Sequence, residues 1–257
     1  EVLIDVRRLA HKAGVIFIRD ELIGLDLKKR NFNYTKLSID IGSNTRETNK
    51  NSFEHQLSIP IKPFEQSFKW IKSHDDAYLD ETLFVLGSGL SAIEIVLALR
   101  KRWPNQKLCL QAHFDKINKN FKKILYQNNI QLVSSGEFID GPSIRCTGNE
   151  APKWLESTGV PVDLSGRVIT NKTLEVVGCP NVFASGDCGV LNENHRPPSG
   201  VWAVKAAATL AENIERMDKG LHLKSWRPKR NSLQLMGVSN INSNKLSKAI
   251  AFYGKSK

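Results

Sequence analysis

Two short glycine-containing segments have the residue types and spacing of a nucleotide-binding protein. The first is Gly87-Ser88-Gly89, which follows the apolar stretch 83–86 and precedes Ala92. In a strand–turn–helix unit, the first glycine allows a tight turn and the second lets the backbone approach a pyrophosphate. Ala92 stands where a third small residue packs the helix on the strand, and the helix N-terminus offers N–H groups to phosphates. A plain glycine turn is the alternative, but the flanking strand and helix favour dinucleotide binding.

The second segment is Gly186-Asp187, which follows the apolar stretch 182–184. A carboxylate at the carboxyl end of a buried strand can accept hydrogen bonds from ribose or ribityl hydroxyls, because ligands of open α/β sheets bind at that edge. An aspartate that only forms a turn is the common alternative, and this segment alone favours it. Taken together, the two segments indicate one site for a flavin and one for a nicotinamide.

The cysteines and the composition exclude several classes of function. Cys109, Cys146, Cys179 and Cys188 have no CxxC or CxxxxC spacing, which argues against a metal site and a redox dithiol. The 257 residues are 40% hydrophobic and 25% charged, as in a soluble globular protein. No apolar run long enough for a transmembrane helix and no signal peptide is visible, so a cytoplasmic protein is expected, with peripheral membrane attachment left open.

The positive charge is concentrated near the C-terminus. Of the net charge of +11, residues 221–257 contribute +8, because they hold eight Lys and Arg and no Asp or Glu, which leaves +3 for the rest. Such a segment can meet nucleic acid, an anionic membrane surface or an acidic partner. Its basic residues are scattered and few aromatics lie among them, which argues against nucleic-acid binding and favours a solvated surface or an interface with a partner domain.

Several predicted elements position the two segments. Stretches 83–86 and 108–110 bracket the glycine motif and its helix as a βαβ unit, with further strands at 131–134 and 143–146. A long helix at 201–217 follows Ser199, a candidate N-cap. The apolar run 15–18 is expected to be a short buried strand.

This order of motifs resembles the pyridine nucleotide-disulfide oxidoreductases, flavoproteins with two dinucleotide-binding domains, and within them the branch that includes type II NADH dehydrogenases. Residues 196–204, Arg-Pro-Pro-Ser-Gly-Val-Trp-Ala-Val, and 226–228, Trp-Arg-Pro, are similar to the flavoprotein module fused to selenide, water dikinase. The resemblance is strongest over 37–45, 83–100, 143–155 and 174–213.

The resemblance implies roles for the residues that match the family's motifs. Asp187, after Gly186, would bind the flavin ribityl chain, and the N–H groups of Val201 and Trp202 would face the flavin pyrimidine ring. Residues 41–43 and 146–148, with Gly42 and Gly148, match the family's two crossover segments. The nicotinamide dinucleotide would be held by the turn residues Gly87, Ser88, Gly89 and Ala92.

The chain also departs from the family's pattern. It has no second GxGxxG for the FAD pyrophosphate, so the FAD domain is expected to be incomplete at its N-terminus and this chain to be a fragment. After the strand at 108–110 the chain reads Leu110-Gln111-Ala112-His113, with no carboxylate before Asp115, where the family usually has a carboxylate that binds a ribose. His113 and Lys116 are candidate partners for a 2′-phosphate instead, and no strong preference for NADH is expected.

The sequence therefore predicts an α/β protein with two dinucleotide-binding Rossmann-like domains. Residues 1–61 and 147–220 are assigned to a partial FAD-binding domain, 62–146 to an NAD(P)-binding domain and 221–257 to an interface segment. The expected function is that of a fragment of an FAD-dependent NAD(P)H oxidoreductase with a small-molecule or quinone-like acceptor, and no catalytic side chain or metal ligand is assigned. The alternative is a non-catalytic nucleotide-binding module of a selenide, water dikinase fusion, with a fused or partner kinase.

Overall fold

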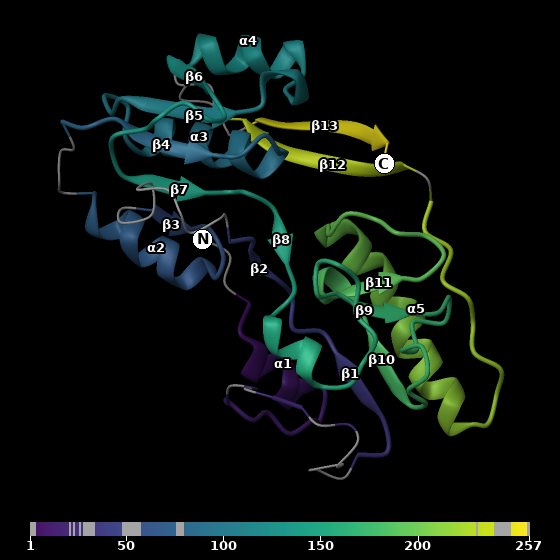
Figure 1. The fold of residues 1–257 in the computed structure, drawn as a ribbon. Coiled ribbons are helices and arrows are strands. Elements are labelled where there is room, and N and C mark those ends of the chain that lie inside the picture. Colours follow the sequence, from purple (N-terminus) through teal and green to yellow (C-terminus); the bar gives the residue numbers. More distant parts are fainter. Residues whose placement is uncertain are drawn as a thin grey trace.

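The computed structural model describes residues 4–20, 22, 24–25, 27, 34–47, 58–75 and 80–229, and the backbone of 231–238 and 248–255. The described chain forms two halves joined by a narrow waist (Figure 1). We call residues 58–75 and 80–146 the five-stranded half. Residues 34–47 and 147–229, which include the long helix α5 (Gly200–Asp218), are called the α5 half.

A parallel sheet organises the five-stranded half, in the strand order β3-β7-β4-β5-β6. Every side chain of β4 and β5, two of the three inner strands, is buried, as expected for continuous apolar strands covered on both faces. The predicted βαβ unit is confirmed, because β4 pairs in parallel with β5. The strands are β3 (Ser58–Pro60), β4 (Leu83–Leu86), β5 (Leu108–Ala112), β6 (Ile130–Ser134) and β7 (Ser143–Arg145).

Three helices pack against one face of this sheet. They are α2 (Phe64–Ser73), α3 (Leu90–Arg102) and α4 (Lys119–Gln127), and they share one hydrophobic core with Val85 and Leu110. Phe84 and Leu86 point to the opposite face and form a smaller cluster with Ile139. Because successive side chains of a strand point to opposite faces, β4 contributes residues to the hydrophobic clusters on both faces of the sheet.

A buried arginine fixes the end of α3 to the loops around it. The Arg100 side chain donates from Nε to the Asn128 carbonyl at 3.0 Å and from Nη2 to the Asn129 carbonyl at 2.8 Å. Its Nη1 donates to the carbonyls of Pro104 and Gln106 at 2.8 and 2.6 Å. Arg100 thus satisfies four carbonyl groups with one side chain, as a planar five-donor group can.

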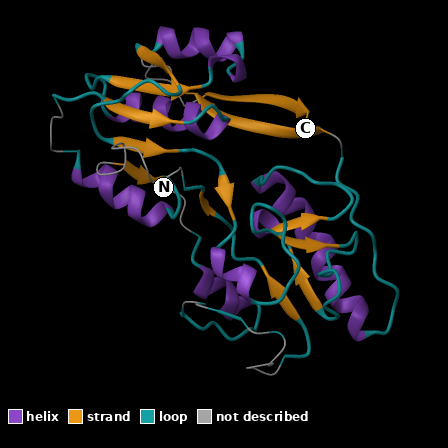
Figure 2. Ribbon diagram, in the orientation of Figure 1, coloured by secondary structure: helices purple, strands orange, loops and turns teal. Residues whose placement is uncertain are grey.

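The α5 half is built on short strand pairs that pack against one long helix. This helix is α5, which lies at the right of Figure 2. Phe183 on β10 is fully buried and packs with Ala206 and Leu210 of the helix. Strand β10 pairs in parallel with β1, and β9 pairs in parallel with β11. The elements are β1 (Leu37–Ile39), β9 (Val168–Thr170), β10 (Val182–Ala184), β11 (Gly189–Leu191) and α5 (Gly200–Asp218).

Two crossings of the chain connect the halves. Strand β2 (Asn44–Thr45) and strand β8 (Asn149–Glu150) pair antiparallel at the waist. The predicted domain boundary follows residue 61, and just before it β3 pairs with β7 inside the five-stranded sheet. Residues 58–61 therefore belong structurally with 62–146.

The ends of the chain differ from the sequence expectation. The run 15–18 is not a buried strand: it follows α1 (Val6–Lys12) without strand pairing, and Ile16 is 91% exposed. Within the predicted interface segment 221–257, β12 (Asn231–Val238) and β13 (Lys248–Lys255) form an antiparallel hairpin. Strand β12 contacts α3 and α5, so this segment touches both halves of the chain.

Replacing Arg100 with methionine is expected to destabilise the chain by about 2–4 kcal/mol. Of the four carbonyls that lose a charged donor, those of Asn128 and Gln106 make buried bonds, and their loss costs most. Urea unfolding followed by circular dichroism measures the change. Arg102→Met on the same helix is the control, since it breaks a partly exposed ion pair with Asp75, and exposed pairs contribute little to stability. Equal effects of the two substitutions would contradict the role given to Arg100.

Candidate dinucleotide-binding site

Gly87 lies where β4 meets its two neighbours in the sheet. Its N–H donates to the Gln111 carbonyl of β5 at 2.9 Å, while the N–H of Cys146, beyond β7, donates to the Leu86 carbonyl at 2.7 Å. The φ angle of Gly87 is +143°, and a Cβ built on it would lie 2.4 Å from the Cys146 carbonyl oxygen. The fold itself therefore requires glycine at 87.

The fold does not require a glycine at position 89. It is the N-cap of α3 with φ −85° and ψ 167°, a conformation open to any residue. A Cβ built on Gly89 would meet nothing within 4 Å. The missing side chain instead leaves open space in front of the helix, which is what close approach of a ligand to the backbone needs.

The N-terminus of α3 faces this space without a side-chain cap. The first N–H groups of a helix have no partner within the helix, and here the N–H groups of Ala92 and Ile93 are the first to bond back, to the Gly89 carbonyl at 3.1 and 3.3 Å. Ala92 is fully buried, and its Cβ lies 3.3 Å from the Cβ position built on Gly87. It fills the place predicted for it, between helix and strand.

An open cleft of about 760 Å³ extends over the carboxyl ends of β4 and β5. The strand order reverses at β4, since β5 and β6 lie on one side and β7 on the other, and such switch points bind ligands. The cleft brings the turn together with the crossover glycine Gly148 and with groups beyond β5. Its polar and charged lining includes Lys62, Ser88, Ser91, Glu94, Gln111, His113, Lys116, Ser135, Thr147 and Asn149.

The second predicted carboxylate, Asp187, lies at the waist and is paired across it. Its Oδ2 accepts a bond from the Ser43 hydroxyl at 3.0 Å and forms an ion pair with Lys62 Nζ at 2.9 Å. Lys62 Nζ also donates to Ser43 Oγ at 3.1 Å. The side chains of Lys62 and Asp187 are 22% and 17% exposed, so water screens this pair only in part.

Lys62 is a site residue that sequence reasoning missed. It lines the open cleft from the start of α2, yet its side chain bonds to residues of the other half. A lone lysine before a proline is typical of a helix start at the surface, so the sequence alone carries no signal for this contact. Gly42 and Gly148, from the two predicted crossover segments, lie beside the same crossing with φ +70° and +107°, a backbone conformation that favours glycine.

The N-terminus of α5 departs in part from its predicted role. The N–H of Trp202 is already bonded to the Ser199 carbonyl at 3.0 Å, which leaves those of Gly200 and Val201 at the helix end. Ser199 is the N-cap, as predicted, but its side chain makes no capping bond. The Trp202 side chain lines a cavity in the α5 half, and its N–H is engaged, so Trp202 does not offer the free N–H group that its predicted role requires.

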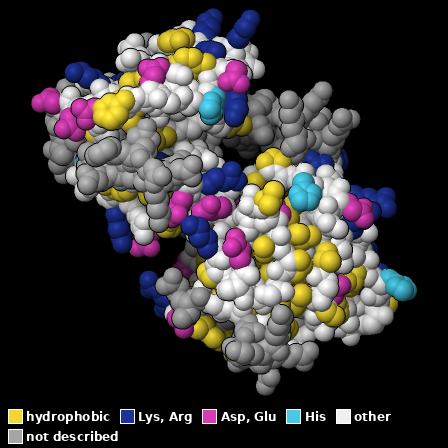
Figure 3. All heavy atoms as spheres, viewed as in Figure 1, with side chains coloured by type: hydrophobic (Ala, Val, Ile, Leu, Met, Phe, Trp, Pro, Cys, Tyr) yellow, Lys and Arg dark blue, Asp and Glu magenta, His cyan; other side chains and the backbone are white. Residues whose placement is uncertain are grey.

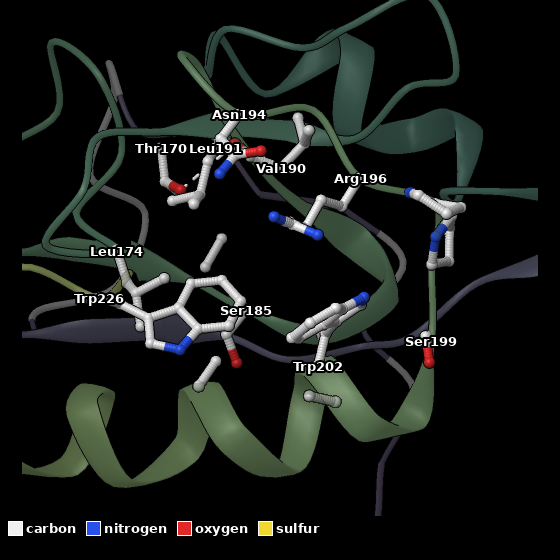
Figure 4. Close-up of a pocket in the computed structure, with 17 residues that line it drawn as sticks. Thr170, Leu174, Ser185, Val190, Leu191, Asn194, Arg196, Ser199, Trp202 and Trp226 are labelled. Carbon is white, nitrogen blue, oxygen red and sulfur yellow. Dashed lines mark hydrogen bonds between the residues drawn. The ribbon is translucent and has the colours of Figure 1, made fainter. Parts of the chain in front are cut away.

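Trp202 lines a small cavity of about 40 Å³ under α5 (Figure 4). The Arg196 guanidinium lies 4.8 Å from the Trp202 ring, and Trp226 lies edge-on to Trp202 at 6.4 Å between ring centroids. Arg196 Nε is buried without a hydrogen-bond partner among the described residues. The cavity is large enough for a few water molecules and too small for a dinucleotide, so the open cleft is the better candidate for nucleotide binding.

The thiols near the two glycine motifs are not poised for chemistry. Burial raises the pKa of the Cys188 thiol to about 11 and that of Cys146 to about 12, so both stay protonated at neutral pH and neither offers a thiolate. The described residues contain no group of His, Cys, Asp and Glu side chains that would hold a metal ion. Nor does any helix among them have the length and apolar character to cross a membrane.

Comparisons with known proteins agree with this fold. No family profile matches the sequence. Ferroptosis suppressor protein 1 of Xenopus tropicalis is 21% identical over 82% of this chain and 66% of its own length. The chain thus spans just under two-thirds of that relative.

Two solved structures have the same arrangement of elements. An FAD-dependent pyridine nucleotide-disulphide oxidoreductase from Desulfovibrio vulgaris is 14% identical over 84% of this chain and 64% of its own, with a TM-score of 0.62. The sulfide:quinone oxidoreductase of Aquifex aeolicus is 15% identical over 95% of this chain and 72% of its own, with a TM-score of 0.66. The chain therefore has the α/β fold of the FAD- and NAD-binding Rossmann-type oxidoreductases, as the sequence predicted.

Proposed function

We propose that this chain is the nicotinamide-binding part and a portion of the flavin-binding part of an FAD-dependent NAD(P)H oxidoreductase. In this function, NAD(P)H binds in the open cleft, hydride passes to a flavin at the waist, and the electrons go on to an acceptor. The proposal rests on a fold that the chain shares with proteins of this kind and, above all, on one observation: Gly89 leaves open space in front of α3 that the fold does not need.

The nicotinamide dinucleotide fits the cleft on three grounds. The volume of about 760 Å³ lies in the range of small-molecule sites. The N-terminus of α3 presents N–H groups and the positive end of the helix dipole to a pyrophosphate. Glycines at 87 and 89 and alanine at 92 keep side chains out of the approach and out of the helix–strand contact.

The residues at the waist fit a flavin. Both bonds that Asp187 accepts go to Oδ2, so Oδ1 remains to accept from a ribityl hydroxyl. When FAD is bound, it supplies the two-electron chemistry between nicotinamide and acceptor. Lys62 compensates the charge of Asp187, and the N-terminus of α5 adds a positive field, so the waist favours the negative charge that arrives with a hydride.

A quinone-like molecule is the proposed acceptor. One structural neighbour is named a sulfide:quinone oxidoreductase, which is the support for a quinone-like acceptor here. The alternative function, a non-catalytic module of a selenide, water dikinase fusion, would use the same cleft without hydride transfer. Anaerobic mixing of the FAD-loaded protein that carries this chain with NADPH distinguishes the two, because bleaching of the flavin absorbance requires hydride transfer.

Gly89→Asp is the sharpest test of the cleft. Aspartate is at least as good an N-cap as glycine, so the melting temperature should hold or rise slightly. The carboxylate would occupy the pyrophosphate space and repel the phosphates, so NADPH affinity should fall more than tenfold, or about 1.4 kcal/mol. Fluorescence titration of residues 1–257 with NADPH measures the affinity.

Gly89→Asn is the matched control for this test, because it has the same shape and capping ability without the charge. We expect it to bind NADPH more weakly than the wild type and more tightly than Gly89→Asp. If all three proteins bind NADPH equally, the pyrophosphate does not lie at the start of α3 and the proposed site is wrong.

Residues 1–257, purified alone, are expected to carry far less than one FAD per chain. Asp187 and the N-terminus of α5 supply contacts on the flavin side, but the sequence has one glycine-rich phosphate turn, and that turn serves the open cleft. Absorbance of the released flavin, set against protein concentration, gives the occupancy. A yellow preparation with near-stoichiometric FAD would show that other residues hold the FAD phosphates.

A further inference from the structure

The end of β5 lacks the group that selects NADH. In Rossmann folds that bind NADH, a carboxylate after the second strand accepts a hydrogen bond from the 2′-hydroxyl of the adenosine ribose. Here the next-to-last residue of β5 is Gln111, which is 8% exposed. Its side-chain Nε2 donates to the Glu137 carbonyl at 2.7 Å. The amide is thus held against the segment after β6 and does not replace the carboxylate.

A cluster of polar and basic groups lies beyond Gln111 in the same cleft. We call Ser88, His113, Lys116 and Ser135 the His113 cluster; all four line the cleft. The N–H of His113 donates to Ser88 Oγ at 2.8 Å, so the glycine-rich turn is tied directly to the loop after β5. His113 Nδ1 and Ser135 Oγ lie 2.7 Å apart, and the N–H of Lys116 donates to the His113 carbonyl at 3.1 Å.

These bonds hold the cluster in a form suited to an anion. The contact with Ser135 orients the imidazole through Nδ1 and leaves Nε2 for another partner. Ser88 accepts from the backbone, so its hydroxyl proton is still available to donate. Lys116 adds a full positive charge. The acidic residue that lines this cleft is Glu94, which belongs to α3 and not to the cluster, and Asp115 does not line the cleft.

We propose that the His113 cluster binds the 2′-phosphate of NADPH and makes the cleft prefer NADPH over NADH. The inference rests on the proposed function, since it requires a nicotinamide dinucleotide in the cleft. The loss of the carboxylate removes the repulsion against a 2′-phosphate, and the cluster adds charge-assisted hydrogen bonds that only NADPH can use. The preference follows from both changes together.

The experiment titrates NADPH and NADH separately against residues 1–257 and follows the fluorescence of the reduced nicotinamide. We expect NADPH to bind at least tenfold more tightly than NADH. Lys116→Gln and His113→Ala should each weaken NADPH about tenfold and leave NADH within about twofold, because a bond to the 2′-phosphate does not exist for NADH. Unchanged NADH affinity also shows that the cleft still folds.

Lys119→Gln is the matched control, since it removes an equal charge from an exposed residue at the start of α4, outside the cleft. If it weakens NADPH as much as Lys116→Gln, the effect is long-range attraction and the cluster is not a binding site. Equal affinities for NADPH and NADH, unchanged by the substitutions in the cluster, would overturn the inference and leave the proposed function standing. If neither dinucleotide binds, the proposed function fails as well.

Discussion

The close passage of the Cys146 carbonyl over Gly87 is the constraint on which the rest of the structure depends. A side chain at 87 would collide with this backbone oxygen, 2.4 Å from its Cβ position. Because glycine is there, β7 and β5 can both pair with β4 up to its end, and α3 can begin directly beyond the turn. The cleft exists because these three strands end together while their connections leave in different directions.

The waist adds the second requirement, a fixed relation between the two halves. On the face seen in Figure 3, Lys, Arg, Asp and Glu side chains gather along this waist. The pair of Lys153 and Glu47 is exposed, and exposed pairs of this kind contribute little to stability. The pair of Lys62 and Asp187 differs because it is largely buried and lies beside the cleft, so it links the position of Asp187 to that of the five-stranded half.

The sequence was sufficient wherever a residue type has one physical explanation. Gly87, Ala92 and the apolar strands were predictable because a tight turn, a close helix–strand contact and a buried sheet each demand those types. The exposed run 15–18 was predicted wrongly, since apolarity indicates burial and does not say what provides it. The pairing of β3 with β7 was also not predictable, because it joins segments far apart in the sequence.

The charged and polar contacts of the site were not predictable from one sequence. Lys62 and Asp187 are 125 residues apart, and nothing in either neighbourhood indicates the other. The sequence indicated His113 and Lys116 only because the carboxylate is missing there. Ser135 lies beside His113 because β6 ends next to β5, which the sequence did not predict. Likewise, the side chain of Trp202 is directed by packing against Arg196 and Trp226. These are tertiary facts, and they required the structure.

Hydrogen–deuterium exchange of residues 1–257 with and without saturating NADPH tests the central claim most directly, namely that the switch-point cleft holds the dinucleotide. Binding of NADPH in the cleft should slow exchange at the turn and first turn of α3, residues 87–93, and at the loop 113–116, with no change around the small cavity beside α5. Protection confined to that cavity, or absent from the turn while NADPH is bound, would contradict it.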